Sequence, residues 1–387
     1  MQVRDELLSY ALPFWGHEEI EAMADTVKSN WWSKGPKTVQ FEKEFAEYVG
    51  AKYAVAMNSC TAALHMALVS HDLQAGDEVI TTPMTFCSSA NTIVHAGGTP
   101  VFADIFAGTG LIDPAQIEAK ITKNTRGILP VHYAGQACDM DKINAIAEKH
   151  GLFVLEDAAH AVHTTYKGKM VGSLGNAAAF SFYATKNLAT GEGGMLTTDD
   201  EALAEELRKM ILHGMSKNAW NRYAKGGTWK YDVESAGFKY NMTDFQAGLG
   251  LVQLKRLGAM QETRERYAQM YNDAFADLPG VELLAETGQG RHAWHLFVIK
   301  ITDALSINRD EFIDELTKLN VGTSVHFIPV INHPYYQKTF GTKPEDCPVT
   351  QEYFNQILSL PLYPSMTESD VNYVIEAVRT IAAGHAK

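Results

Sequence analysis

The sequence predicts an α/β fold, because short apolar segments alternate with helical segments over residues 52–200. These apolar segments contain few polar residues, which is typical of parallel strands that are buried on both faces. Near residue 250 the alternation gives way to a long helical segment followed by shorter elements. We therefore expect a large domain over residues 1–248, which includes the N-terminal segment, and a smaller C-terminal α+β domain over residues 249–387.

The strands of the large domain are expected at Lys52–Met57, Glu78–Thr81, Pro100–Asp104, Arg126–His132, Leu152–Glu156, Ala177–Tyr183 and Gly194–Thr198. Helical spacing or helix-start residues predict helices at Thr61–Val69, Pro114–Lys120 and Asp139–His150. The last two strands flank the glycine-rich Gly191-Glu192-Gly193-Gly194, so they would bring this loop to the edge of the sheet.

The second part is expected to contain a long helix at Thr243–Ala276, strands at His295–Ile301 and Thr323–Phe327, a loop rich in proline and tyrosine at Pro329–Tyr336, and a closing helix. The closing helix has the clearest local signal. Thr367 and Asp370 have the spacing of a capping box, and the valines and isoleucine that follow form one apolar stripe.

The overall charge and the cysteines restrict the class of protein. The formal net charge is −13 and the basic residues form no stripe, so nucleic acid is not an expected partner. The four cysteines include no CxxC pair, which suits a reducing compartment. The first ten residues lack the pattern of a signal peptide, and no apolar segment reaches the roughly 18 residues of a membrane span. We expect a cytoplasmic protein with no membrane partner.

The histidines do not predict a metal site. Although the chain has 14 of them, His160 and His163 flank Ala161-Val162 at a spacing that matches neither HExxH nor a zinc finger. We therefore expect no metal.

Asp157 and Lys186 are the first candidates for chemistry. Asp157 directly follows the carboxyl end of the apolar strand expected at Leu152–Glu156, where open α/β sheets bind their ligands, and an acid there could pair with a protonated ring nitrogen. Lys186 follows an apolar, aromatic strand and precedes the glycine-rich loop. Burial inside a pocket lowers the pKa of a lysine amine, and the unprotonated amine is a nucleophile for carbonyl carbon.

The segment Asn58-Ser59-Cys60-Thr61-Ala62-Ala63 combines hydroxyl side chains with a helix start, directly after the first strand. Helix starts of this kind bind phosphate, although serine and threonine also cap helices that bind nothing. The fingerprints GxGxxG and GxxxxGK[ST] are absent from the sequence, which disfavours a dinucleotide-binding fold and a P-loop.

Seven ordered segments together resemble the DegT/DnrJ/EryC1/StrS family of sugar aminotransferases, over nearly the whole chain. They are Gly35-Pro36-Lys37, Thr61-Ala62-Ala63-Leu64-His65, Gly76-Asp77-Glu78-Val79-Ile80, Pro130-Val131-His132-Tyr133-Ala134-Gly135, Glu156-Asp157-Ala158-Ala159-His160, Lys186-Asn187 with Gly191-Glu192-Gly193-Gly194, and Tyr240-Asn241-Met242-Thr243-Asp244. Two later segments, His292–Phe297 and Ser359–Pro364, are similar to family members that make the nucleotide form of 4-amino-4-deoxy-L-arabinose.

The resemblance implies pyridoxal phosphate (PLP) fold-type I architecture, like that of aspartate aminotransferase, with a mostly parallel seven-stranded sheet. PLP, alternating with its aminated form PMP, would be the cofactor of the large domain. Lys186 would carry it through a bond to its aldehyde carbon, and Asp157 would pair with its ring nitrogen. The resemblance assigns the other contacts as follows: His160 to the ring hydroxyl, Phe86 to the ring face, and Cys60, Thr61 and Ser181 to the phosphate, with Asn241 of a second subunit. It therefore implies a homodimer with shared active sites.

Several positions depart from the family pattern. Cys60 stands where glycine is common, and Lys239 where many relatives have asparagine, so either Lys239 or Asn241 could make the contact between subunits. Lys34 and Tyr183 also depart from the pattern, at places that could face the sugar, and with His326 they are the expected substrate-binding residues.

The implied reaction moves an amino group from an amino acid, expected to be L-glutamate, to a nucleotide-linked keto-sugar, expected to be a 4-keto sugar, in amino-sugar or surface-polysaccharide biosynthesis. Lys34, Lys225 or Lys230 could supply positive charge for the nucleotide. A competing hypothesis is a PLP-dependent sugar dehydratase of the same family, which has histidine in place of the cofactor lysine. The sequence also leaves open a non-catalytic ligand-binding regulator and a nicotinamide-dependent dehydrogenase.

Overall fold

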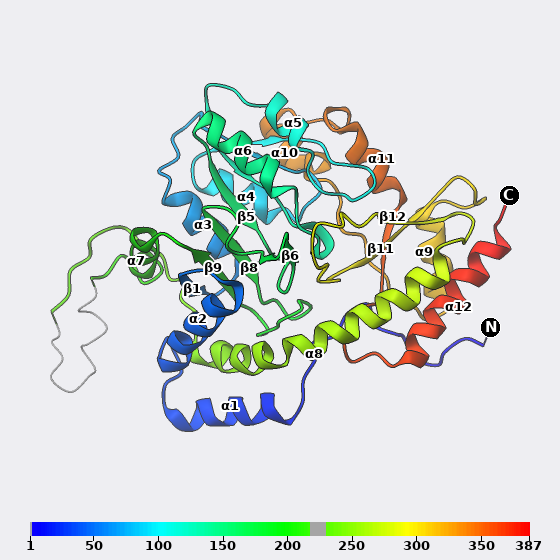
Figure 1. Cartoon of the computed structure of the whole chain (residues 1–387), viewed down its shortest axis with the longest axis horizontal. Coiled ribbons are helices and arrows are strands. Elements are labelled where there is room, and N and C mark those ends of the chain that lie inside the picture. The colour runs from blue at the N-terminus through cyan, green and yellow to red at the C-terminus, as the bar shows by residue number, and fades with distance from the viewer. Residues whose placement is uncertain (1, 217–229) are drawn as a thin grey trace.

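The computed structural model describes residues 2–216 and 230–387, and its centre is a seven-stranded sheet with a three-stranded sheet beside it (Figure 1). The strands of the large sheet are β1 Tyr53–Met57, β2 Glu78–Thr81, β3 Thr99–Phe102, β4 Thr125–Leu129, β5 Phe153–Asp157, β8 Ala177–Ser181 and β9 Gly194–Thr198. Their order is β1-β9-β8-β5-β4-β2-β3, and β9 runs antiparallel to both of its neighbours. The prediction of a mostly parallel seven-stranded sheet is confirmed, with strand bounds close to those expected.

Alternate residues of the strands enter two different cores, one on each face of the sheet. Ala54 and Ala56 of β1 pack with α2, α6 and α8, whereas Val55 and Met57 pack with α3 and α7. The helices around this sheet are α1 His17–Ser29, α2 Pro36–Val49, α3 Cys60–Val69, α4 Ser88–His95, α5 Pro114–Ala119, α6 Met140–His150 and α7 Glu201–Met210. The sheet is buried on both sides, and ligands can therefore reach it only at the strand ends.

The second sheet has its own core. It is antiparallel, with β10 Val281–Leu283, β11 Phe297–Ile301 and β12 Ile357–Leu360, and it is accompanied by α9 Arg309–Lys318, α10 Pro334–Phe340, α11 Pro348–Gln356 and α12 Glu368–Gly384. The remaining short elements are β6 Thr165–Tyr166, β7 Lys169–Met170, η1 Tyr133–Gly135, η3 Val330–Asn332 and η4 Pro344–Asp346. The capping box of Thr367 and Asp370 is confirmed at the start of α12.

The long helix α8, Asp244–Phe275, connects the two parts and is visible as the yellow-green helix across Figure 1. The proposed boundary at residue 248 falls within its first turns. The N-terminal segment, although it precedes the large sheet in sequence, reaches the second core. There Leu8 is buried and pairs with Val321.

Several features of the chain differ from the expectation. The segment Thr323–Phe327 is not a strand. Only Ser324 pairs with the sheet, through Ser359, and the His326 carbonyl accepts a hydrogen bond from Tyr133 instead. In addition, no element was predicted where α1, α2, α4, α7, β10 and β12 lie, and the segment Pro329–Tyr336, expected as a loop, contains η3 and the start of α10.

The start of α2 is set by a contact that is distant in sequence. The carboxylate of Asp244 accepts the backbone N–H groups of Gly35 (2.8 Å), Lys37 (3.0 Å) and Thr38 (2.9 Å). A side chain on Gly35 would collide with this carboxylate, because a Cβ there would lie 2.6 Å from Oδ2 of Asp244. The Gly35-Pro36-Lys37 motif therefore begins a helix that is capped from another part of the chain.

Candidate active site

A cavity of about 500 Å³ opens where the strands of the large sheet end. Its walls come from both parts of the molecule, with Asp157, Ser181 and Lys186 on the side of the large sheet and His295 and His326 on the other. The carboxyl ends of parallel strands are the usual ligand site of open α/β sheets.

Lys186 lies in the turn after β8, where its backbone N–H bonds to the carbonyl of Tyr183 at 2.9 Å. Its Nζ is 3.3 Å from Nε2 of His295. Burial lowers the pKa of the Lys186 amine to about 8, although Cys60 and Asp157 nearby act in the opposite direction. A useful fraction of the amine is therefore unprotonated, and nucleophilic, near neutral pH.

Asp157 is the last residue of β5, and its carboxylate is buried in the floor of the cavity. Ser89 Oγ donates to its Oδ2 at 2.7 Å, and the Ala159 N–H donates to its Oδ1 at 3.1 Å. Burial raises the pKa of Asp157, while these hydrogen bonds and the charge of Lys186 oppose the rise. A cation against this carboxylate would stabilise its charged form.

The first turn of α3 forms another wall of the cavity, through Ser59, Cys60 and Thr61. Ser59 caps the helix, because its Oγ accepts the Ala62 N–H at 3.1 Å. Gly194 lets β9 approach this turn, since a Cβ there would lie 2.4 Å from the Cys60 nitrogen. A helix start that faces a cavity is suited to a phosphate group.

Cys60 would contribute to this anion site through its backbone. Its thiol points toward the carbonyl of Ala179, at 3.6 Å, and burial raises the pKa of the thiol well above its usual value. The thiol therefore stays neutral, while Ser181, also on the cavity wall, offers a hydroxyl.

Four further predicted residues line the cavity: Phe86, His160, Tyr183 and His326. Phe86 and Tyr183 present exposed rings. The Nδ1 of His160 accepts the Ala134 N–H at 3.3 Å. His326 bonds to Ser359 Oγ at 2.9 Å, and burial lowers its pKa to about 3.

Other predicted residues do not reach this cavity within one chain. Lys34 is buried, with its Nζ 3.1 Å from Oε1 of Glu42, and this ion pair holds it in the interior. Asn241 donates to the Met242 carbonyl at 3.0 Å, and neither it nor Lys239 is on the cavity wall. Lys230 is exposed and away from the wall. Lys225 lies outside the described residues.

Ser89, Tyr10 and His295 are among the residues of the site that the sequence did not indicate. Ser89 bonds to Asp157, while Tyr10 of the N-terminal segment and His295 line the cavity. His295 belongs to a segment that resembles the family, so the motif itself could have drawn attention to it. Neither Ser89 nor Tyr10 carries a local signal.

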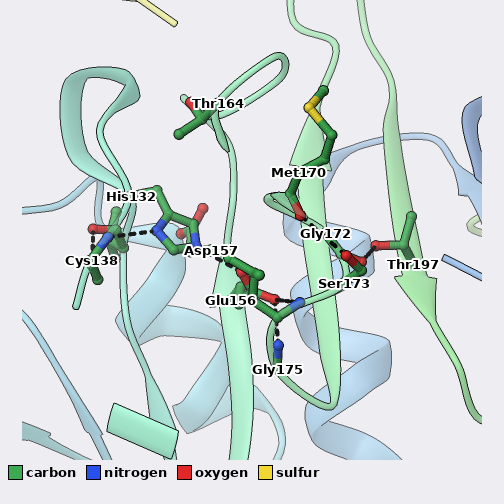
Figure 2. Close-up of polar contacts among 12 residues, drawn as sticks. His132, Cys138, Glu156, Asp157, Thr164, Met170, Gly172, Ser173, Gly175 and Thr197 are labelled. Atoms are coloured by element: carbon green, nitrogen blue, oxygen red, sulfur yellow. Dashed lines mark hydrogen bonds and ion pairs between the residues drawn. The ribbon is translucent and has the colours of Figure 1, made fainter. Parts of the chain in front are cut away.

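The residue before Asp157 faces a different environment (Figure 2). Glu156 is fully buried and accepts three hydrogen bonds, from His132 Nε2 (2.9 Å), Leu174 N (3.2 Å) and Gly175 N (2.7 Å). The Cys138 N–H donates to Nδ1 of His132 at 3.1 Å, so the ring proton lies on Nε2 and is donated to Glu156.

Within residues 2–216 and 230–387, no helix is both long and apolar enough to cross a membrane. In the same ranges, no three histidine, cysteine or acidic side chains are grouped as metal ligands would be.

Comparisons with known proteins agree with this fold. Residues 14–379 match the model of the DegT/DnrJ/EryC1/StrS aminotransferase family. The spore coat polysaccharide biosynthesis protein SpsC of Bacillus subtilis is 59% identical to this chain, over 99% of both sequences.

Solved structures also match over nearly the whole chain. Spr1654 of Streptococcus pneumoniae, described as a sugar aminotransferase and solved in a PLP form, superposes with a TM-score of 0.92 at 32% identity, over 98% of this chain and 99% of the other. Helicobacter pylori PseC, an aminotransferase involved in the biosynthesis of pseudoaminic acid, has a TM-score of 0.92 at 29% identity, over 98% and 100%. The chain belongs to the DegT/DnrJ/EryC1/StrS aminotransferase family.

Proposed function

We propose that this PLP-dependent sugar aminotransferase transfers an amino group from L-glutamate to the 4-keto group of a nucleotide-linked sugar, and that it acts in polysaccharide biosynthesis. Spr1654, a family neighbour, has been solved in both PLP and PMP forms, the two cofactor states between which an aminotransferase alternates. The names of SpsC and PseC support an amino-sugar or polysaccharide product. The observation that carries the proposal is one cavity that holds Lys186, Asp157 and the start of α3.

The residues fit PLP by their chemistry. Lys186 offers an amine of lowered pKa, and the first turn of α3 offers backbone N–H groups for phosphate. Asp157 offers a buried carboxylate whose hydrogen bonds, among the described residues, come from a hydroxyl and a backbone N–H rather than from a cation. Thr61 and Ser181 add hydroxyls, and Phe86 an exposed aromatic face. When bound, the cofactor supplies an electrophilic carbon and an electron-accepting ring.

Within this frame Lys186 acts as the general base and acid. Its amine takes the α-proton of the amino acid and later returns a proton during amination of the sugar. Asp157 would hold the ring nitrogen, because a buried carboxylate stabilises a positive charge placed beside it. His160, Tyr183 and His326 line the same cavity and are our candidates for orienting the cofactor and the sugar.

The retained lysine separates the proposal from the dehydratase hypothesis. With histidine at position 186, the enzyme would lack the flexible amine that accepts and returns the proton. The family assignment also makes a nicotinamide-dependent dehydrogenase untenable.

The first experiment tests both the identity of the amino donor and the role of Lys186. The purified protein should take up PLP and become yellow, and L-glutamate should bleach the colour. Lys186→Ala should lower turnover by at least about 10³-fold, the scale of losing a general acid–base group, while thermal unfolding stays close to that of the parent.

Lys209→Ala is the matched control, because this lysine lies on α7, is half-buried, pairs with Glu234 at 2.7 Å and is not on the cavity wall. Normal turnover in Lys186→Ala, or a protein that takes up no PLP, would contradict the proposal. For the acceptor, ¹⁵N-labelled glutamate and a panel of nucleotide keto-sugars should yield one labelled amino-sugar by mass spectrometry.

A homodimer with shared sites is also part of the proposal. Three exposed tryptophans flank α1, with Trp15 before it and Trp31 and Trp32 after it, and large exposed apolar groups of this kind often mark an interface. If Asn241 of a second subunit completes the site, mixing Lys186→Ala chains with Asn241→Ala chains should restore activity that neither variant has alone. Lys239→Ala, tested in the same way, decides which of the two residues makes the contact.

A further inference from the structure

The amine of Lys186 meets an imidazole that comes from the other part of the molecule. Lys186 follows β8 of the large sheet, whereas His295 precedes β11 of the small one, and their Nζ and Nε2 atoms are 3.3 Å apart. His295 is buried and is one of the cavity-lining residues.

The hydrogen bonds of Asn187 determine which ring nitrogen of His295 faces the lysine. Asn187 Nδ2 donates to the Ala293 carbonyl at 2.7 Å, so its Oδ1 is the atom that lies 3.1 Å from Nδ1 of His295. An amide oxygen only accepts, and Nδ1 must therefore carry the proton. The lone pair of Nε2 consequently points toward Lys186.

The segment before His295 is held by side chains on both sides of the cavity. Three consecutive backbone carbonyls each accept a side-chain N–H. The bonds are Gln261 Nε2 to His292 O (3.0 Å), Asn187 Nδ2 to Ala293 O (2.7 Å) and Arg264 Nη1 to Trp294 O (3.2 Å). A segment held at three successive residues places its next side chain precisely.

The surroundings keep the imidazole neutral. Burial lowers the pKa of His295 well below its usual value, and the charges of Lys186 and Arg264 act in the same direction. The titratable groups that face the pair are Cys60, Asp157, His160, Arg264 and His326.

We propose that His295 is a positioning residue for Lys186, whose unprotonated Nε2 accepts a hydrogen bond from the lysine amine. The neutral amine donates one N–H to this nitrogen and keeps its own lone pair free for the proton of the substrate. After it takes that proton, the ammonium group donates to the same nitrogen. The bond therefore holds Lys186 in both protonation states, and Asn187, the next residue in the chain, keeps the imidazole in the tautomer that makes this possible. This inference rests on the proposed role of Lys186 as general base and acid.

The first test uses the full chain without cofactor. Labelling of Lys186 by acetic anhydride, followed by mass spectrometry across pH, gives the midpoint at which the amine becomes reactive. His295→Leu removes an acceptor that favours the ammonium form, so the midpoint should fall by about one pH unit. His295→Gln, which can still accept a hydrogen bond, should restore most of this change.

The second test uses the PLP-loaded enzyme and L-glutamate. In His295→Leu, kcat of the bleaching half-reaction should fall by roughly 10²-fold while the KM for glutamate changes by less than about threefold, because positioning of the base matters in the transition state more than in binding. His295→Gln should again recover part of the loss.

His292→Asn is the matched control. His292 is a buried histidine of the same segment, its Nδ1 accepts the Trp294 N–H at 2.8 Å, and its ring stacks on Trp294 away from the lysine. Equal changes in His292→Asn and His295→Leu would overturn the inference, as would an unchanged midpoint in a folded His295→Leu. If the parent protein does not bind PLP or react with glutamate, the proposed function fails, whereas the labelling experiment still tests the contact between His295 and Lys186.

Discussion

Glu156 and Asp157 are neighbours on β5, and both carboxylates are buried, but they point to opposite sides of the strand. Glu156 accepts three hydrogen bonds in a closed network with His132 and the loop before β8 (Figure 2). Asp157 accepts two and faces the open cavity.

The difference shows how one strand can serve both stability and chemistry. A buried carboxylate whose oxygens are fully bonded holds parts of the fold together, and it has little capacity left for a ligand. A buried carboxylate with fewer partners, beside a cavity and near Lys186, is a group that a cationic ligand can complete. We therefore expect Glu156 to govern stability and Asp157 to govern the reaction.

We expect the largest effect in Asp157→Asn, and we expect it on the rate of the reaction. The amide keeps the shape of the side chain but removes the negative charge beside the ring nitrogen, so kcat/KM should fall by about 10³-fold. Steady-state kinetics measures this fall, and thermal unfolding of the same preparation should show a stability close to that of the parent. A loss of stability as large as the loss of activity would remove the distinction between the two acids.

Glu156→Gln should show the opposite pattern. It removes the charge from a buried network, which leaves His132 and the N–H groups of Leu174 and Gly175 with a weaker partner. The free energy of unfolding should fall by about 3 kcal/mol. Chemical denaturation measures this fall.

The activity of the remaining folded Glu156→Gln protein should stay within about threefold of the parent. If kcat/KM falls as far in this variant as in Asp157→Asn, Glu156 takes part in the reaction and our division of the strand is wrong.

Much of the large sheet could be predicted from the sequence, because a strand buried on both faces is a short apolar segment. The predicted segments Glu78–Thr81 and Gly194–Thr198 agree with β2 and β9 in both bounds. The helix α2 was missed because its first turn is capped by Asp244, far along the chain. The segment Thr323–Phe327 was wrongly predicted as a strand, since Phe327 lines the cavity and the backbone of the segment bonds to the side chains of Tyr133 and Met84.

The candidate site likewise has residues that the sequence predicted and residues that it did not. Lys186, Asp157 and the start of α3 stand in local motifs, and the structure brings them to one cavity. The residues that support them were not predicted, because their contacts are not local. Ser89 is 68 positions from Asp157, and His295 is 109 positions from Lys186. No pattern within a window of the sequence could indicate such pairs.

The smallest expected effect concerns the hydroxyl of Ser89, which bonds to Asp157 and not to Glu156. Ser89 Oγ donates to Asp157 and favours its ionised form, so Ser89→Ala should raise the pKa of this carboxylate further above its usual value. Activity that needs the ionised carboxylate is present above this pKa and is lost as the pH falls through it. The acidic limb of the pH profile of kcat/KM should therefore move upward by about one pH unit.

Ser173→Ala is the matched control, because Ser173 Oγ donates to the Met170 carbonyl at 3.2 Å in the region of Glu156, and it should leave the limb unchanged. An equal movement in both variants, or none in Ser89→Ala, would mean that Asp157 is not the acid whose ionisation the profile reports.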